Sequence, residues 1–393
     1  MRQVAFHRPS IGPEEEREVI DTLRSGWITT GPKAKRFERD FAEYVGAKNA
    51  IAVAHCTGAL HLALWALGIG PGDEVITTPF TFTATAEVLG YLGARPVFVD
   101  VDPGTFNINP ARVEEVLESG RLKNVRAIEP VHFAGHPCDM DRLCAIARKY
   151  NLKIVEDAAH AVGASRHMEG RGNAKIGTIG DLTCFSFYAT KNFTTAEGGM
   201  ITTADDALAE KITIASLHGM NKDAWKRYDK SGSWYYEIHD TGFKYNLSDV
   251  HAAIGLPQLK RSDEFMRRRT EVACRYNEAF RGESAVQVPY VERGIEHAWH
   301  LYVMRLRPEQ LRIGRNQFVE TLRERGVGVS VHCIPLHTMH FYQRTYGYRN
   351  GEFPVAEDIF SRCLSLPIYA AMSDDDIDYV TQTVRDIIRE NRR

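Results

Sequence analysis

Residues 50–72 read AIAVAHCTGALHLALWALGIGPG and lie within the longest stretch of this 393-residue chain that carries no formal charge. The stretch is long enough to raise the question of a membrane span. However, two histidines, a proline and four glycines interrupt it. The resulting pieces predict a strand at 51–54, a turn of small residues, and a helix at 59–67 that ends at glycine. We therefore expect a soluble strand–turn–helix unit and no membrane span.

The same order of elements continues along the next 130 or so residues. Strands are predicted at 75–78, 96–99, 127–131, 153–156, 182–186 and 199–203, and helices at 84–92, 140–150 and 205–217. Strands that alternate with helices form a mostly parallel sheet with helices on both faces, which is an α/β fold. Ligands of such sheets bind at the carboxyl ends of the strands. The chemistry is therefore expected at those ends.

The length of the chain predicts a second, smaller domain, because a single core of this size would be unusual. An apolar periodicity with many charges at 248–281 predicts a long helix that kinks at Pro257, which has no amide hydrogen to donate. We place the boundary there, with a large domain at 1–250 and a small C-terminal α/β domain at 251–393. In the small domain we predict strands at 299–306 and 327–332 and helices at 315–325 and 374–390.

Composition excludes several classes of protein. The 49 basic and 51 acidic residues give a net charge of -2, which argues against a nucleic-acid partner. The seven cysteines are an odd number and form no Cys-x-x-Cys pair, so neither a disulfide framework nor a metal site is expected. The first ten residues contain no apolar core typical of a signal peptide, and we expect a cytoplasmic protein.

Residues that could act in catalysis or ligand binding stand at three strand ends. Asp157 ends the strand at 153–156, although an aspartate there could equally cap a helix. Ser186 and Lys191 follow the strand at 182–186, where a buried lysine could form a Schiff base and the serine could hold a phosphate. A solvated loop lysine is the simpler alternative for Lys191.

A third strand end is the turn at 57–59, where Thr57, Gly58 and Ala59 open a helix. Free amides and the helix dipole at such a position suit a phosphate. Together the three strand ends call for a flat, phosphorylated ligand with a ring nitrogen and an aldehyde. Pyridoxal 5'-phosphate fits this description, with its phosphate on the turn, its ring nitrogen on Asp157 and its aldehyde on Lys191.

The sequence resembles the DegT/DnrJ/StrS family of sugar aminotransferases, which are pyridoxal-phosphate enzymes of the aspartate-aminotransferase fold, fold type I. The matching stretches are SGWITTGP (25–32), GDEVITTP (72–79), VHFAG (131–135), EDAAH (156–160), SFYATK (186–191), EGG (197–199) and YNL (245–247). Within the family the chain is most similar to the UDP-4-amino-4-deoxy-L-arabinose aminotransferase branch, through His160, AEGG (196–199) and HAWH (297–300).

The resemblance implies a role for each matching residue. Lys191 would bind pyridoxal 5'-phosphate covalently and also move the proton, and Asp157 would hold the ring nitrogen protonated. His160 would complete the catalytic set near the ring, although it could also be a helix-start histidine. Phe82 would stack on the ring, with a core position as the alternative. The amides of Gly58 and Ala59 and the hydroxyl of Ser186 would bind the phosphate.

Other matching residues are implied in substrate binding and assembly. Asn246 matches an asparagine that completes the phosphate site of the neighbouring subunit, which implies a homodimer; helix capping is its alternative. His332 and His337, in HCIPLH (332–337), would contact the substrate, as would Trp27 and Thr29.

The implied reaction transfers an amino group from L-glutamate to a keto group of a nucleotide-linked sugar, in our reading a 4-keto sugar on UDP. The product would serve surface polysaccharide or lipopolysaccharide biosynthesis. One alternative is a pyridoxal-dependent sugar dehydratase, in which histidine can replace the lysine. Another is a non-catalytic regulator, which would not need to keep Lys191.

Overall fold

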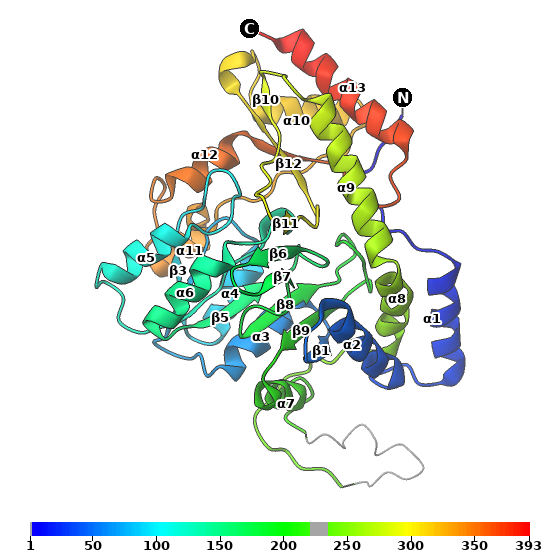
Figure 1. Ribbon diagram of the computed structural model, residues 1–393, viewed down its shortest axis with the longest axis vertical. Helices are drawn as coiled ribbons and strands as arrows, with labels where there is room; N and C mark the ends of the chain where they lie inside the picture. The colour runs from blue at the N-terminus through cyan, green and yellow to red at the C-terminus, as the bar shows by residue number, and fades with distance from the viewer. Residues whose placement is uncertain (1, 221–234) are drawn as a thin grey trace.

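The computed structural model describes residues 2–220 and 235–393, which are built around a seven-stranded sheet (Figure 1). The strands are β1 (Asn49–Val53), β2 (Glu74–Thr77), β3 (Arg95–Phe98), β4 (Val125–Ile128), β5 (Lys153–Asp157), β8 (Leu182–Ser186) and β9 (Gly199–Thr203). Their order is β1-β9-β8-β5-β4-β2-β3, and pairing is parallel from β8 through to β3. β9 runs antiparallel to both of its neighbours in this sheet, β1 and β8.

Helices cover both faces of this sheet. One face packs against α3 (Cys56–Ala66), α4 (Thr83–Tyr91) and α7 (Asp206–Ala215). The other packs against α2 (Pro32–Val45), α5 (Pro110–Glu118), α6 (Met140–Tyr150) and α8 (Asp249–Lys260). The predicted α/β fold, with a mainly parallel sheet between helical layers, is confirmed.

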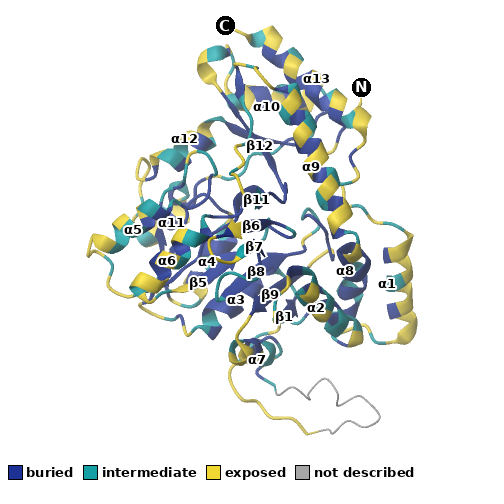
Figure 2. Cartoon of the chain, viewed as in Figure 1, coloured by how far each residue is buried: buried dark blue, intermediate teal, exposed yellow. Residues whose placement is uncertain are grey.

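The apolar stretch at 50–72 owes its composition to the position of α3. This helix packs between β8 and β9 on one side and α4 and α7 on the other. Nine of its eleven residues are buried, and Figure 2 shows it as dark blue as the strands beneath it. A helix buried on all sides must be apolar all round, which explains why the stretch looks like a membrane segment by composition alone.

The C-terminal part of the chain forms a second core. Its elements are α9 (Ser262–Ala279), β10 (Val286–Gln287), β12 (Tyr302–Leu306), α10 (Arg315–Glu324), β13 (Cys363–Leu366) and α13 (Asp374–Asn391). Their apolar residues make one cluster, to which Val4 also belongs. In Figure 1, α9 leads from α8 beside the large sheet to α10 and α13 near the chain ends. The boundary at 250 stays our proposal. The N-terminal segment packs on the C-terminal core through Val4, which makes a single bridge to Val327.

The remaining elements connect these cores. They are α1 (Pro13–Ser25), β6 (Ser165–Met168), β7 (Gly172–Lys175), β11 (Ile295–Glu296), α11 (His340–Tyr346) and α12 (Pro354–Arg362), with short 3-10 turns at Phe133–Gly135, Pro308–Gln310 and Leu336–Thr338. Within the described residues, no helix is both long enough and apolar enough to cross a membrane.

Two predictions of local structure were wrong. The single helix predicted at 248–281 is divided in two: α8 contains Pro257 and ends at Lys260, and the break before α9 lies at Arg261, whose φ and ψ are -95° and 3°. Arg261 is held there by its side chain, which donates to the Ser10 hydroxyl at 3.1 Å. Residues 327–332 form no strand; they make only single bridges, Val327 to Val4 and Ser330 to Ser365. Their pairing partners lie on different segments, so no ladder can extend.

Candidate active site

The carboxyl ends of β5 and β8 open into a cavity of about 440 Å³. Asp157 is the last residue of β5, Ser186 is the last residue of β8, and Lys191 lies in the loop that follows. Seven of the residues singled out from the sequence line this cavity: Thr57, Phe82, Asp157, His160, Ser186, Lys191 and His332. The tertiary structure therefore gathers them from segments spread over 276 positions of the chain, from 57 to 332 inclusive.

Asp157 is buried and is held by two hydrogen bonds. The amide of Ala159 donates to Oδ1 at 3.0 Å, and the hydroxyl of Thr85 donates to Oδ2 at 2.8 Å. Burial raises the pKa of the Asp157 carboxyl above its usual range, and these two donors oppose that rise. Asp157 thus presents to the cavity a carboxylate whose charged form is stabilised by two hydrogen-bond donors.

Lys191 faces a cavity that disfavours its charged form. Burial lowers the pKa of the Lys191 ammonium, and Cys56 and Asp157 oppose this change. Burial and the nearby Lys191 also lower the pKa values of three histidines in the cavity wall. The pKa values of His160 and His300 lie well below the usual value, and that of His332 is about 4. A neutral amine is the nucleophilic form that addition to an aldehyde requires.

The ring of His160 is fixed from two sides. Its Nδ1 accepts a hydrogen bond from the amide of Ala134 at 3.2 Å, which leaves the proton of the neutral ring on Nε2. His300 lies against it, with ring centroids 4.3 Å apart. Gly135 allows this contact, because a Cβ there would lie 2.8 Å from the Ala298 Cβ and 2.9 Å from the His160 carbonyl oxygen, and its φ is +94°. His160 is therefore a positioned ring, not a helix-start residue.

The start of α3 differs in detail from the predicted phosphate cradle. His55 caps this helix, and its Nδ1 accepts the amide hydrogen of Gly58 at 2.8 Å. The amide of Ala59 donates to the carbonyl of His55 at 3.1 Å, and Ala59 is fully buried. Of the three predicted cradle residues, Thr57 lines the cavity. For Gly58 to donate to a phosphate, the His55 ring must first turn away.

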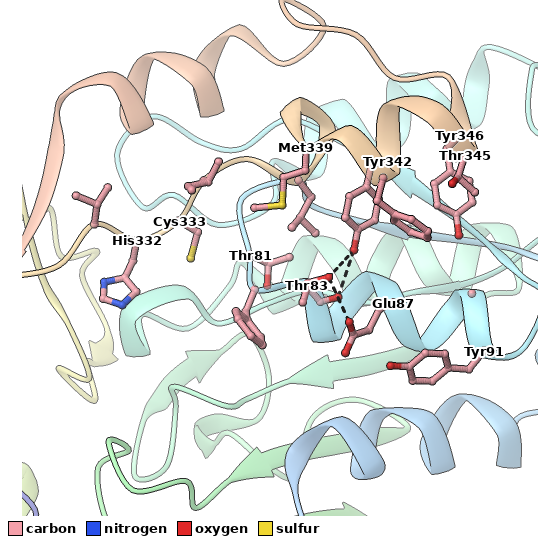
Figure 3. A pocket seen from close by; sticks show the side chains of 16 residues that line it. Thr81, Thr83, Glu87, Tyr91, His332, Cys333, Met339, Tyr342, Thr345 and Tyr346 are labelled. Atoms are coloured by element: carbon pink, nitrogen blue, oxygen red, sulfur yellow. Dashed lines mark hydrogen bonds between the residues drawn. The ribbon is translucent and has the colours of Figure 1, made fainter. Parts of the chain in front are cut away.

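Phe82 stands at the mouth of the cavity with 70% of its surface exposed, so the alternative of a core position was wrong. It also borders a second cavity of about 910 Å³ between α4 and α11 (Figure 3). Tyr342 in this second cavity shares a 2.8 Å hydrogen bond with Thr83, whose hydroxyl also contacts Glu87. The two cavities share four lining residues: Thr81, Phe82, His332 and Cys333.

Three other predicted residues lie apart from the Lys191 cavity, next to the start of α8. Asn246 donates from Nδ2 to the Thr30 hydroxyl at 2.6 Å, and the Trp27 ring nitrogen donates to the Thr30 carbonyl at 3.0 Å. The carbonyl of Thr29 accepts from the Asp249 amide at 3.0 Å. Ser248, not Asn246, caps α8, so the capping alternative for Asn246 was wrong.

His337 has a structural position. Its side chain is fully buried, its Nε2 contacts Glu357 at 2.8 Å, and its ring packs on Phe353. A side chain enclosed in this way does not reach a bound substrate, so the structure does not support the predicted contact. His332, by contrast, lines both cavities and is held through Nδ1 by the Ser365 hydroxyl at 2.9 Å.

Sequence reasoning assigned no role to several residues in and around the cavity. Thr85 does not line the cavity but holds Asp157, and His300 lines the cavity but belongs only to a matching tetrapeptide. Cys333 lines the cavity beside His332, and burial raises its pKa to about 12. Their common feature is that their role depends on a contact across the fold, which local sequence patterns do not encode.

The residues present fit pyridoxal 5'-phosphate. The cavity offers an amine on Lys191, a supported carboxylate on Asp157, and a hydroxyl on Ser186 near the start of a helix. This donor set matches, in one enclosed space, the aldehyde, ring nitrogen and phosphate of that cofactor. Fold and site together define an enzyme that uses pyridoxal 5'-phosphate.

Comparison with known proteins gives the family. Residues 9–385 match the DegT/DnrJ/EryC1/StrS aminotransferase family, and the chain belongs to it. It is 52% identical to the uncharacterized protein MJ1066 of Methanocaldococcus jannaschii, over 98% of this chain and 97% of that one. It is 49% identical to the spore coat polysaccharide biosynthesis protein SpsC of Bacillus subtilis, with the same coverage.

Solved structures agree with this assignment. Spr1654 from Streptococcus pneumoniae in its PMP form superposes with a TM-score of 0.90 at 34% identity, covering 99% of this chain and 98% of that one. The same protein has been solved in a PLP form. The protein described here is accordingly an aminotransferase that uses pyridoxal 5'-phosphate.

Proposed function

We propose that this enzyme moves an amino group from L-glutamate to the 4-keto group of a UDP-linked sugar. The observation that carries the proposal is the single cavity that holds Lys191, with its lowered pKa, opposite a supported carboxylate on Asp157. The sugar acceptor is supported by the similarity to SpsC, whose name places it in spore coat polysaccharide biosynthesis. The nucleotide and the 4-keto position rest on the resemblance to the arabinose branch.

Each residue of the cavity then has a task. Lys191 would hold the cofactor and could also carry the proton, because its neutral amine can both add to a carbonyl and accept a proton. Asp157 would hold the ring nitrogen in its protonated form. The bound cofactor supplies an electron sink. Ser186 and the start of α3 hold the phosphate, and His160 and Phe82 fix the ring.

The second cavity is our candidate for the nucleotide end of the acceptor. It borders the first at the four shared residues, and aromatic side chains from α4 and α11 line it (Figure 3). Flat rings suit stacking on a base. Its described lining includes no lysine or arginine, so any basic side chains that bind the phosphates of a nucleotide must lie outside this lining.

We further propose a cytoplasmic homodimer in which Asn246 completes the phosphate site of the other subunit. In support, Asn246 lies beside Trp27 and Thr29 and away from the cavity of its own chain. The side chain of Lys244 also donates to Asn246, which places a cation in the same group. An Asn246→Ala variant is expected to weaken cofactor binding.

The proposal is tested by a glutamate-coupled screen against UDP-, dTDP- and GDP-linked keto sugars. We expect 2-oxoglutarate formation with a UDP-linked 4-keto sugar and none with Lys191→Ala. The protein should be yellow, and borohydride should fix the cofactor on Lys191. Turnover by Lys191→Ala would overturn the role of this lysine, and a preference for another nucleotide would overturn the assigned substrate.

A further inference from the structure

Two glutamates are completely buried in the central sheet, and they differ sharply in their surroundings. Glu156 accepts from the Gly180 amide and the Thr183 hydroxyl at 2.7 Å each, and contacts His132 Nε2 at 2.9 Å. Glu129 is equally buried, yet neither of its carboxyl oxygens has a hydrogen-bond partner among the described residues. An unpaired buried carboxylate is very costly, whereas a protonated carboxyl costs much less.

The position of Glu129 is fixed by the sheet and brings it close to Asp157. Its amide donates to the Ile76 carbonyl at 2.7 Å, and its carbonyl accepts from the Thr77 hydroxyl at 2.8 Å. Val131, two residues later, bridges to Asp157. Because residues two apart on a strand share a face, Glu129 lies on the face of the sheet that carries Asp157, one step further into the core.

The titratable groups near Glu129 lie on the elements packed against it. Asp157 on β5 is the principal one; Cys56 on α3 and Cys184 on β8 also interact with Glu129, and Lys191 acts on Asp157 and Cys56. Burial first, and then the charge of Asp157, raise the pKa of Glu129 well above its usual range. Asp157 has two hydrogen-bond donors and Glu129 has none, so the charge resides on Asp157 and the proton on Glu129.

We propose that Glu129 is a second acid of the ring-nitrogen site, which holds a proton while Asp157 is the only charged carboxyl and holds it less tightly when a cation binds to Asp157. A protonated pyridine ring is such a cation; its charge would offset the repulsion from Asp157, while burial continues to favour the protonated carboxyl. In the fraction of molecules that then ionise, the O–H bond of Glu129 breaks and the proton passes to the buffer. Glu129 is thus a positioning residue that acts through Asp157. The inference rests on the ring-nitrogen role proposed above for Asp157.

The test measures proton release when pyridoxamine 5'-phosphate binds to the full-length, cofactor-free protein. This form of the cofactor has no aldehyde and cannot condense with Lys191. Titrations in buffers of different ionisation enthalpy give the number of protons exchanged. We expect wild type to release more protons than Glu129→Gln, by up to about one per site, and its affinity to rise more steeply with pH.

A matched control is Glu38→Gln on α2. Burial also raises the pKa of Glu38, but Lys35 and the amide of Ala52 partner it away from the cavity. This variant should release as many protons as wild type. Equal release by wild type and Glu129→Gln would overturn the inference.

Infrared spectroscopy of the wild type gives an independent measurement if Glu129→Gln does not fold. A protonated carboxyl band that weakens on addition of pyridoxamine 5'-phosphate, in wild type and in Glu38→Gln alike, supports the proposal. A band absent at neutral pH, or unchanged by the ligand, contradicts it. If instead Asp157→Asn binds pyridoxamine 5'-phosphate as tightly as wild type does, the proposed role of Asp157 itself fails.

Discussion

Thr85→Val tests whether the charge on Asp157 governs catalysis. The substitution keeps the shape of the side chain and removes the hydroxyl that donates to Asp157 Oδ2 at 2.8 Å, while the Ala159 amide still donates to Oδ1. Thr85 is fully buried, so water does not readily replace the lost donor. A hydrogen bond to a charged group contributes about 1.5–3 kcal/mol, and one pKa unit corresponds to about 1.4 kcal/mol. The pKa of Asp157 should therefore rise by roughly one to two units.

The direction of the effect follows from the proposed role. Activity requires Asp157 ionised, and the variant raises the pKa of Asp157 above a value that burial has already raised. The acid limb of the kcat/KM profile should therefore move to higher pH by about one to two units, while the rates converge at alkaline pH. In the cofactor-free protein, a carboxyl with a raised pKa makes the fold less stable as pH rises through that pKa, and the variant should show this loss more strongly.

The assay is the pH dependence of kcat/KM for the amino donor, together with the visible absorbance of the bound cofactor. The matched control is Thr202→Val. Thr202 is also buried, and its hydroxyl donates to the Gly177 carbonyl at 2.8 Å, but it lies on β9, away from Asp157 on β5. This control should leave the profile unchanged. A Thr85→Val profile that superposes on that of the wild type would refute the reasoning.

Two further predictions concern the framework of the site. Gly199→Ala places a Cβ 2.7 Å from the His55 carbonyl carbon and 2.8 Å from the Cys56 nitrogen, so the start of α3 must shift. Cofactor affinity, measured by titration, and melting temperature, measured by calorimetry, should both fall. Unchanged values would contradict this prediction. His132→Leu removes the donor to Glu156 and the acceptor of the Cys138 amide, both in the core. It should lower the free energy of unfolding by about 2–6 kcal/mol, as measured in urea, and a loss below about 1 kcal/mol would show that these groups find other partners.

Much of the large domain could be predicted because its elements have strong local signals. The helix at Met140–Tyr150 and the strands at Leu182–Ser186 and Gly199–Thr203 have the bounds expected from periodicity and flanking residues. Prediction failed where a distant partner decides the outcome. The break between α8 and α9 lies at Arg261, whose side chain contacts the distant Ser10, and residues 327–332 lack a strand because their partners lie on two different segments.

The candidate site divides in the same way. Asp157 and Ser186 end strands and Lys191 lies in the loop after one, and a parallel sheet brings such ends together whatever the remaining sequence is. Thr85 and His300 act through contacts across the fold, one to the Asp157 carboxylate and one to the His160 ring. The local sequence around either position does not predict those contacts.

By itself, the sequence determined the α/β fold, the family and the cofactor, because repeated strand–helix units and short motifs carry that information locally. It also predicted that the apolar stretch at 50–72 forms a strand–turn–helix unit instead of a membrane span, as β1 and α3 show. The tertiary structure alone decided that α3 is buried on both sides, that His55 occupies the Gly58 amide, and that Glu129 lies unpaired below Asp157. Charge and hydrogen bonding at a site depend on distances between segments far apart in the chain, and only folding sets those distances.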